Sequence, residues 1–138
     1  MHYDDAEWHT DSVIDLGLEQ SAAATHIGMF LTWAALHNMI ATTLSDHNEV
    51  IDAARHRLVT PGVIAEKYFV SQICSFMLND HGNRFAKDAY RAYLNALERF
   101  PVVARCETTY HLPDTWDTYD EMAPYFDELY AVWRVERW

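Results

Sequence analysis

Histidines and carboxylates lie close together at the start of the chain, where His2, Asp4, Asp5 and His9 fall within eight residues. Such side chains bind catalytic zinc and act as general acids and bases. Their spacing matches neither H-E-x-x-H, nor a Cys/His zinc pattern, nor an acidic calcium loop. We therefore predict no metal site and no cofactor. The alternative is a small metal-dependent hydrolase that uses a cluster of His2, His9 and His26.

A second pair of histidines, His26 and His37, lies eleven positions apart in an apolar segment. In a helix this spacing places both side chains on one face, about 16 Å apart. That separation is too large for one ion to bind both of them. We expect each to be a helix histidine that forms a hydrogen bond at the edge of the core.

Other catalytic arrangements are missing from the sequence. There is no G-x-S-x-G nucleophile elbow, and the four glycines are isolated, so no phosphate-binding loop can be built. Cys74 lies in an apolar run, where a neutral packing thiol is expected rather than a reactive thiolate. We predict no catalytic residue.

Acidic residues are concentrated at the two ends of the chain. Residues 1–19 hold six acids and no Lys or Arg, and residues 107–138 hold eight acids and two Arg. Residues 20–106 hold seven acids and eight bases, so the two ends account for the net charge of −11. Clustered carboxylates steer and hold basic partners, and they repel nucleic acid. The pattern favours a positively charged protein partner and disfavours direct nucleic-acid binding.

Length and composition indicate one folded domain. The chain has 138 residues, half of them hydrophobic, which is enough to bury a core. Two cysteines are too few for a disulfide framework, and no secretory signal is visible, so a cytoplasmic location is predicted. The most apolar stretch, 27–41, is too short to span a membrane.

The elements that must position these side chains are mostly helices. Apolar spacing and the rare breakers predict a mainly α-helical domain over 1–138, a bundle of about five helices with one short extended segment at most. An irregular acidic arm covers 1–19, the helical body 20–106, and an acidic, aromatic region 107–138. The predicted helices cover about 21–44, 46–57, 60–77, 79–100, and 113 onward with an interruption at Pro124.

Some boundaries carry specific signals. Asp46 and Glu49 form a capping-box pattern, and Thr60 and Asn79 are candidate N-caps. The end of the third helix could instead be partly strand, and residues 102–112 read as extended.

The aromatic residues of the last segment divide into two groups. The helical spacing of one group predicts core positions for Trp116, Phe126, Leu129 and Trp133. The other group is expected at the surface: Tyr119, Tyr125, Tyr130 and Trp138.

Four segments resemble a family of small, uncharacterised bacterial cytoplasmic proteins. The segments are Tyr3–His9, which fits Y-D-x-A-x-W-H; Ala24–Trp33, which fits A-T-H-I-G-M-F-x-x-W; Leu78–Ala86; and Asp114–Tyr119. The family is associated with immunity partners of bacterial antagonistic toxins. The resemblance implies no catalytic residue, and it implies inhibition by binding.

Together, charge and resemblance predict an immunity protein that covers the basic active-site cleft of a cognate toxin. We expect Trp8 and His9 to pack onto the helix that carries His26 and thereby fix the arm. The predicted toxin-binding residues are Asp4, Asp5, Glu7, Asp11, Asp15, Asp114, Asp117, Asp120, Glu121, Asp127, Glu128, Tyr119, Tyr125 and Tyr130. A regulatory or adaptor protein without a toxin partner is a further alternative.

Overall fold

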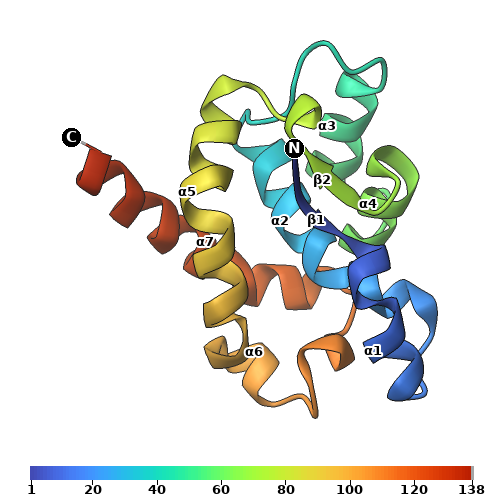
Figure 1. Cartoon of the computed structure of the whole chain (residues 1–138). Helices are drawn as coiled ribbons and strands as arrows, with labels where there is room; N and C mark the ends of the chain where they lie inside the picture. Colours follow the sequence, from blue (N-terminus) through green and yellow to red (C-terminus); the bar gives the residue numbers. More distant parts are fainter. Residues whose placement is uncertain (138) are drawn as a thin grey trace.

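Seven α-helices and one two-stranded sheet make up residues 1–137, the part of the chain that the computed structural model describes (Figure 1). The α-helices are α1 (Thr10–Asp15), α2 (Thr25–Leu36), α3 (His47–Arg55), α4 (Pro61–Phe69), α5 (Asp80–Ala96), α6 (Pro101–Ala104) and α7 (Trp116–Arg137). The strands are β1 (His2–Asp5) and β2 (Gln72–Cys74), and the short 3₁₀ helices are η1 (Ala6–His9), η2 (Gln20–Ala24), η3 (Ser75–Met77), η4 (Leu97–Arg99) and η5 (Thr109–His111). The predicted mainly α-helical single domain is confirmed, with seven helices in place of about five.

The central element is α2, in which residues 25–35 are all buried. A helix that is apolar on every side must be surrounded by other elements. Helices α3, α4 and α7 contact it directly, and aromatic side chains of α5 pack against it. Gly28 permits the close approach of α4, because a Cβ atom at this position would overlap the carbonyl group of Pro61.

The core helix is shorter than predicted. We expected a helix over 21–44, but residues 20–24 form η2, and α2 ends at Leu36. Asn38 then takes a φ of 58°, a left-handed conformation that Asn tolerates better than most residues. Ile40 pairs with Leu78 in an antiparallel bridge, so the apolar residues beyond α2 join another part of the core.

The start signals of α4 and α5 are confirmed. The side chains of Thr60 and Asn79 each accept a hydrogen bond from a backbone N–H in the first turn of the helix that follows. Asp46 precedes α3 but makes no capping hydrogen bond, so that capping box is wrong. Val70 and Ser71 both have positive φ and end α4, after which the chain forms β2, as the partly extended alternative proposed.

Two expectations for the second half of the chain are wrong. Residues 102–112 are not extended, because Pro101 begins α6 and η5 follows it; proline suits the first turn of a helix. The last helix is not interrupted either, because α7 runs through Pro124. Pro124 and Asp120 are both exposed, so water can hydrate the carbonyl group that proline leaves without a donor.

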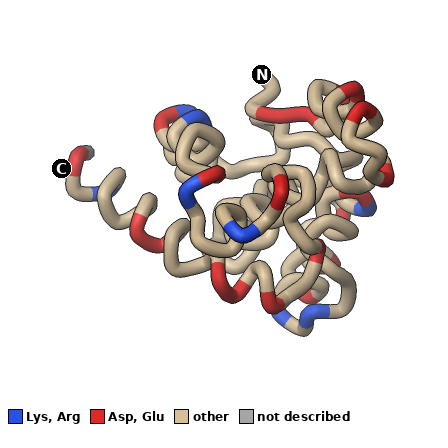
Figure 2. The backbone as a smooth tube through the Cα atoms, turned by 90° about the horizontal axis from the view of Figure 1, so that it is seen from below, with Lys and Arg blue, Asp and Glu red and all other residues tan. Residues whose placement is uncertain are grey.

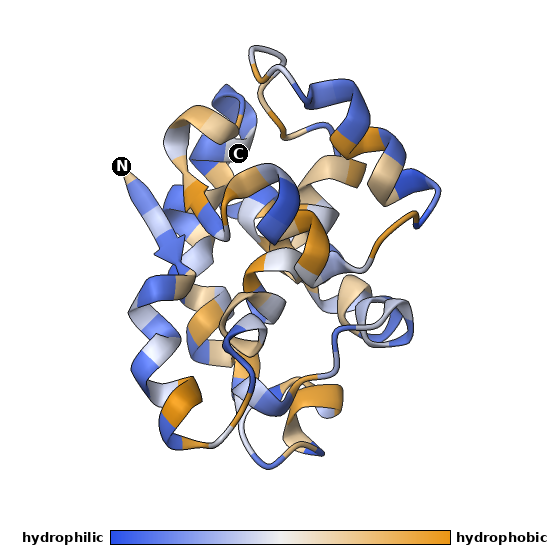
Figure 3. Ribbon diagram, turned by 90° about the vertical axis from the view of Figure 1, so that its right-hand side faces the viewer, coloured by the Kyte–Doolittle hydropathy of each residue, from blue (hydrophilic) through white to orange (hydrophobic). Residues whose placement is uncertain are grey.

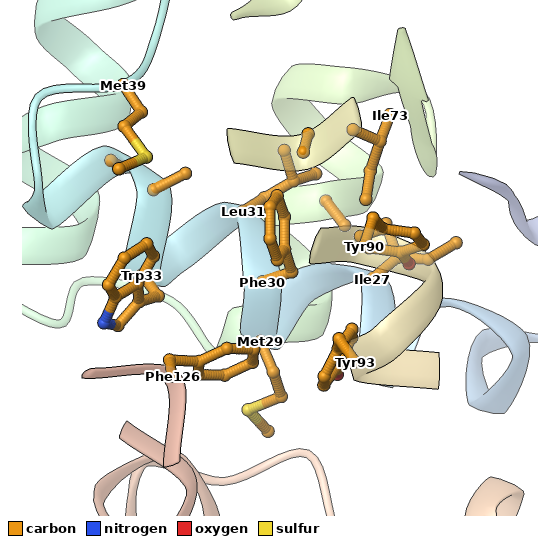
Figure 4. Packing of buried hydrophobic residues seen from close by; sticks show 14 of the residues in the cluster. Ile27, Met29, Phe30, Leu31, Trp33, Met39, Ile73, Tyr90, Tyr93 and Phe126 are labelled. Atoms are coloured by element: carbon orange, nitrogen blue, oxygen red, sulfur yellow. The ribbon is translucent and has the colours of Figure 1, made fainter. Parts of the chain in front are cut away.

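Aromatic side chains from three helices meet around α2, as Figure 4 shows. Trp33 lies 5.4 Å from Phe85 of α5, and Tyr93 of α5 lies 4.9 Å from Phe126 of α7, between ring centroids. Rings at these separations and tilts add to the stabilisation that burial provides. Figure 3 shows apolar segments along the central helices and hydrophilic residues over much of the periphery, with a few apolar turns also at the outer edges. The last turns of α7 project away from the body (Figure 1).

The structure also bears on two sequence-based expectations, the packing role of Cys74 and the lack of a membrane-spanning helix. Cys74 is buried and free, and burial raises the pKa of its thiol, in agreement with a packing role. Among the helices within residues 1–137, none is both long enough and apolar enough to cross a bilayer.

Candidate functional site

The N-terminal arm is ordered and carries the most unusual polar residue of the fold. Strand β1 pairs antiparallel with β2, so the expectation of an irregular arm is wrong for residues 2–15. The pairing is irregular between His2 and Asp4, and Asp4 points inward with only 1% of its surface exposed. Asp5 then caps η1, whose single turn brings His9 back over Asp4. The site therefore starts from a strand and the 3₁₀ turn that follows it.

The carboxylate of Asp4 accepts four hydrogen bonds. Its Oδ1 lies 2.7 Å from Nε2 of His9 and 2.8 Å from the backbone N of Asp5. Its Oδ2 lies 2.9 Å from Nε2 of His26 and 2.5 Å from the hydroxyl of Tyr90. An ionised carboxylate can only accept, so both Nε2 atoms carry the proton in this arrangement. Strand β1, η1, α2 and α5 each contribute to the cluster (Figure 1).

The hydrogen bonds keep Asp4 ionised in spite of its burial. Burial alone would raise the pKa of this carboxyl, but the hydrogen bonds from His26 and His9 outweigh it and hold the pKa well below its ordinary value. Burial raises the pKa of the Tyr90 hydroxyl, and the negative charge of Asp4 raises it further. Tyr90 therefore stays protonated and donates to the carboxylate.

A second layer of tyrosines holds the two histidines. Nδ1 of His9 lies 2.7 Å from the hydroxyl of Tyr110, and the His9 and His26 rings meet edge to face with centroids 4.7 Å apart. The hydroxyl of Tyr93 donates to the backbone carbonyl of His26 at 2.8 Å. Tyr110 thus holds the His9 imidazole, and Tyr93 holds the backbone that carries His26. We name Asp4, His9 and His26, with Tyr90 and Tyr110, the Asp-His cluster.

The Asp-His cluster forms part of the walls of two pockets. The larger has a volume of about 360 Å³, and its lining includes Asp4, His9 and Tyr90. The smaller, about 180 Å³, includes His9, His26 and Tyr110. His9 keeps 19% of its side chain exposed, so solvent and small molecules can reach the cluster through this residue.

Three members of the cluster form a donor set for a metal ion. One ligand atom from each of Asp4, His9 and His26 lies within 4.8 Å of the other two. Ligand atoms around a tetrahedral zinc ion lie roughly 3.4 Å apart, so small side-chain movements would accommodate one. With an ion in place of the two imidazole protons, Asp4 would retain its hydrogen bonds from Tyr90 and Asp5, and His9 its bond to Tyr110. Such outer hydrogen bonds typically orient metal ligands.

Several predicted toxin-binding residues are not at the surface. Asp4 and Asp5 are buried because β1 is part of the fold, and Tyr119, in the first turn of α7, is buried in the core. Asp114 is half-buried, and its carboxylate accepts hydrogen bonds from Thr60 and the backbone of Gly62 at the start of α4. The expectation of exposed contact residues is therefore wrong for Asp4, Asp5 and Tyr119, whereas Asp114 keeps part of its surface exposed.

Of the remaining carboxylates, three have partners within the fold. Asp120 pairs with Arg57 at 2.5 Å, Glu121 pairs with Arg105 at 2.6 Å, and Asp127 accepts a hydrogen bond from the indole of Trp33. The other five predicted carboxylates are exposed and form no ion pair with a Lys or Arg of residues 1–137: Glu7, Asp11, Asp15, Asp117 and Glu128. Figure 2 shows acidic residues both on α7 and on the opposite side of the fold, so they do not gather on one face.

The aromatic residues partly follow the prediction. Phe126 and Trp133 are buried, Trp116 and Leu129 are half-buried, and Tyr125 is exposed. Tyr130 is half-buried, with its hydroxyl 2.7 Å from His81. Trp138 lies outside the described residues.

The predicted packing of the arm is correct for His9 and wrong for Trp8, whose surface is 61% exposed. His37 lies just beyond the end of α2 and not within the helix, but it forms the expected hydrogen bond at the edge of the core, to the carbonyl of Trp33.

The histidine that lies beside His26 is His9 and not His37, because the carboxylate of Asp4 joins the two imidazoles. The helical spacing of His26 and His37 gave no indication of this contact. His2, from the proposed histidine cluster, is exposed and lies beside Gln72 instead. Tyr90 and Tyr110 gave no signal, because nothing in their local sequence shows which carboxylate or imidazole they contact.

The comparisons with known proteins identify a family without assigning an activity. A family model for a domain of unknown function, DUF7832, matches residues 2–112. That range contains the whole Asp-His cluster and excludes α7. Neither the curated proteins nor the solved structures that were searched gave a match. The chain belongs to the DUF7832 family.

Proposed function

We propose that the protein is a metal-dependent hydrolase whose centre consists of Asp4, His9 and His26. The observation that carries the proposal is the convergence of two imidazoles and one carboxylate at the wall of a pocket. Two histidines and a carboxylate are a donor set of catalytic zinc and of non-haem iron. Three protein ligands, in contrast to the four of a structural zinc site, leave a position for water or substrate.

The chemistry follows from that open position. A divalent ion lowers the pKa of a bound water molecule toward neutrality, so that hydroxide is available at physiological pH. With an ion held by Asp4, His9 and His26, this nucleophile would allow hydrolysis of an ester, amide or phosphoester, in which the water oxygen replaces the leaving group and the leaving group takes up a proton. Tyr90 and Tyr110 fix Asp4 and His9, and the half-buried setting strengthens the electrostatic interactions.

Metal binding is the first test. Tag-free protein, dialysed against a chelator, is titrated with Zn²⁺ and Mn²⁺ by calorimetry, and the metal content of the purified protein is measured by elemental analysis. We expect about one ion per chain, binding weakened by at least about a hundredfold in His9→Gln, and an effect of about tenfold in Tyr110→Phe. His56→Gln is the matched control, because His56 is exposed and lies outside the cluster. Circular dichroism verifies that each variant is folded.

Two results would refute the hydrolase. One is the absence of a bound ion at any tested concentration up to the millimolar range; the other is unchanged affinity in His9→Gln. Where binding is confirmed, activated ester and phosphoester substrates are assayed with and without the ion. Hydrolysis should require the metal and disappear in His9→Gln while His56→Gln retains it.

As a second candidate, we propose a cytoplasmic immunity protein that neutralises a cognate toxin with a basic surface. A specific observation favours it: the exposed acids Glu7, Asp11 and Asp15 lie on η1 and α1 and form no Lys or Arg ion pair within residues 1–137. Unpaired carboxylates are available for steering a basic partner. Compared with the sequence-based prediction, the proposed surface is restricted to the arm.

Co-expression tests this candidate. The protein is produced together with the product of any toxin-like gene adjacent to its own, and cell survival and co-purification are measured. The triple variant Glu7→Lys, Asp11→Lys, Asp15→Lys should lose protection, while Glu49→Lys, an exposed change on α3, should keep it. Full protection by the triple variant would contradict a role of the arm. Protection is expected to be independent of metal, which separates this candidate from the hydrolase.

A further inference from the structure

We propose that the pocket beside Asp4 binds a small molecule with an anionic group and a planar ring. The inference rests on the proposed function, because it names the substrate class of the same site. The pocket, of about 360 Å³, falls within the size range of small-molecule sites. Its lining combines members of the Asp-His cluster with Trp8, Lys87 and Arg91.

The charge of this pocket is opposite to that of the chain. Lys87 and Arg91 lie one turn apart on α5, and neither forms an ion pair with any residue of the described range 1–137. The chain as a whole is acidic, with ten Lys and Arg against 21 Asp and Glu. Two unpaired cations at one pocket therefore give this pocket a local charge that differs from that of the chain. Asp4 in the lining stays ionised, but its carboxylate is buried and all its donors come from within the fold, so two exposed cations stand against one buried negative charge. The local field therefore favours an anion.

Trp8 supplies a surface for a ring. Its side chain lines the pocket, and 61% of the residue surface is exposed. The nearest ring contact is His2, whose centroid lies 6.1 Å away at a tilted angle, so the indole face is not covered by close stacking. Exposed aromatic faces bind planar groups by stacking. A ligand that joins an anionic group to an aromatic ring would use both parts of this lining.

The test uses phenyl phosphate as the probe, with benzoate, inorganic phosphate and benzyl alcohol for comparison. Binding to tag-free protein is measured by ligand-observed NMR in the presence of EDTA, so that no metal ion can hold the phosphate. We expect phenyl phosphate or benzoate to bind and benzyl alcohol to bind at least about tenfold more weakly. Comparing the two anions distinguishes a phosphate-bearing from a carboxylate-bearing ligand.

Variants assign the contacts. Lys87→Gln and Arg91→Gln should each weaken phenyl phosphate binding about fivefold, while Arg84→Gln, on the same helix but outside the pocket, should not. Trp8→Ala should weaken phenyl phosphate by about tenfold and leave inorganic phosphate unchanged.

Equal binding of benzyl alcohol and phenyl phosphate, or unchanged binding by the Lys87→Gln, Arg91→Gln double variant, would overturn the inference. Because the assay is free of metal, its outcome is independent of the metal titration that tests the hydrolase.

Discussion

Replacing Asp4 by Asn tests whether the buried carboxylate holds the arm to the body. The change keeps the side-chain shape and one oxygen, but it places an amide NH₂ where Oδ2 accepted bonds from His26 and Tyr90. Hydrogen bonds to a charged group contribute about 1.5–3 kcal/mol each, so two lost bonds correspond to about 3–6 kcal/mol. The Tyr90 hydroxyl can rotate and the His26 imidazole can change tautomer, so that each can form a new hydrogen bond to the amide. These new bonds recover part of the lost free energy. We expect a loss of about 3 kcal/mol in the free energy of unfolding.

Urea denaturation followed by circular dichroism measures this quantity for the wild type, Asp4→Asn and Asp11→Asn. Asp11→Asn makes the same change of charge at an exposed position, and it should alter stability by less than about 0.5 kcal/mol. In a chain of 138 residues, a loss of 3 kcal/mol lowers the melting temperature by roughly 9 °C. A loss below about 1 kcal/mol for Asp4→Asn would refute the conclusion that four hydrogen bonds stabilise an ionised Asp4.

The same pair of proteins gives a dependence on pH. The native pKa of Asp4 is held below its ordinary value of 3.8. A carboxyl with a depressed native pKa stabilises the fold above the unfolded pKa, and this stabilisation is lost as the pH falls toward the native pKa. The difference in unfolding free energy between wild type and Asp4→Asn should therefore be constant above about pH 5 and decrease below pH 4. A difference that stays constant down to pH 3 would contradict an ionised native Asp4.

Three further substitutions probe the fold. Gly28→Ala should lower stability by more than about 3 kcal/mol or prevent folding, because the new Cβ overlaps the Pro61 carbonyl; soluble yield and urea denaturation measure the effect. Phe126→Ala removes a fully buried ring and should cost about 3–5 kcal/mol, measured the same way. Arg57→Ala breaks the exposed ion pair with Asp120 and should change stability by no more than about 1 kcal/mol, a difference that decreases in 0.5 M salt.

Local signals determined much of the helical architecture. Thr60 and Asn79 begin helices because their side chains cap backbone groups three residues away, and such contacts are encoded within a single turn. The unbroken apolar run after His26 required a helix surrounded on all sides, which is what α2 became. The predicted helix boundaries were wrong where the backbone conformation depends on residues that are distant in the sequence. Residues 72–74 became a strand because β1 pairs with them.

The Asp-His cluster depended on tertiary structure. His26 and Tyr90 lie 22 and 86 positions from Asp4, so their meeting on one carboxylate is decided by how β1, α2 and α5 pack. The sequence by itself determined that the chain is acidic at both ends, helical, and large enough for one core. Only the tertiary structure decided which carboxylates are buried. A buried carboxylate must gather donors from whatever elements surround it, and no local spacing specifies that set.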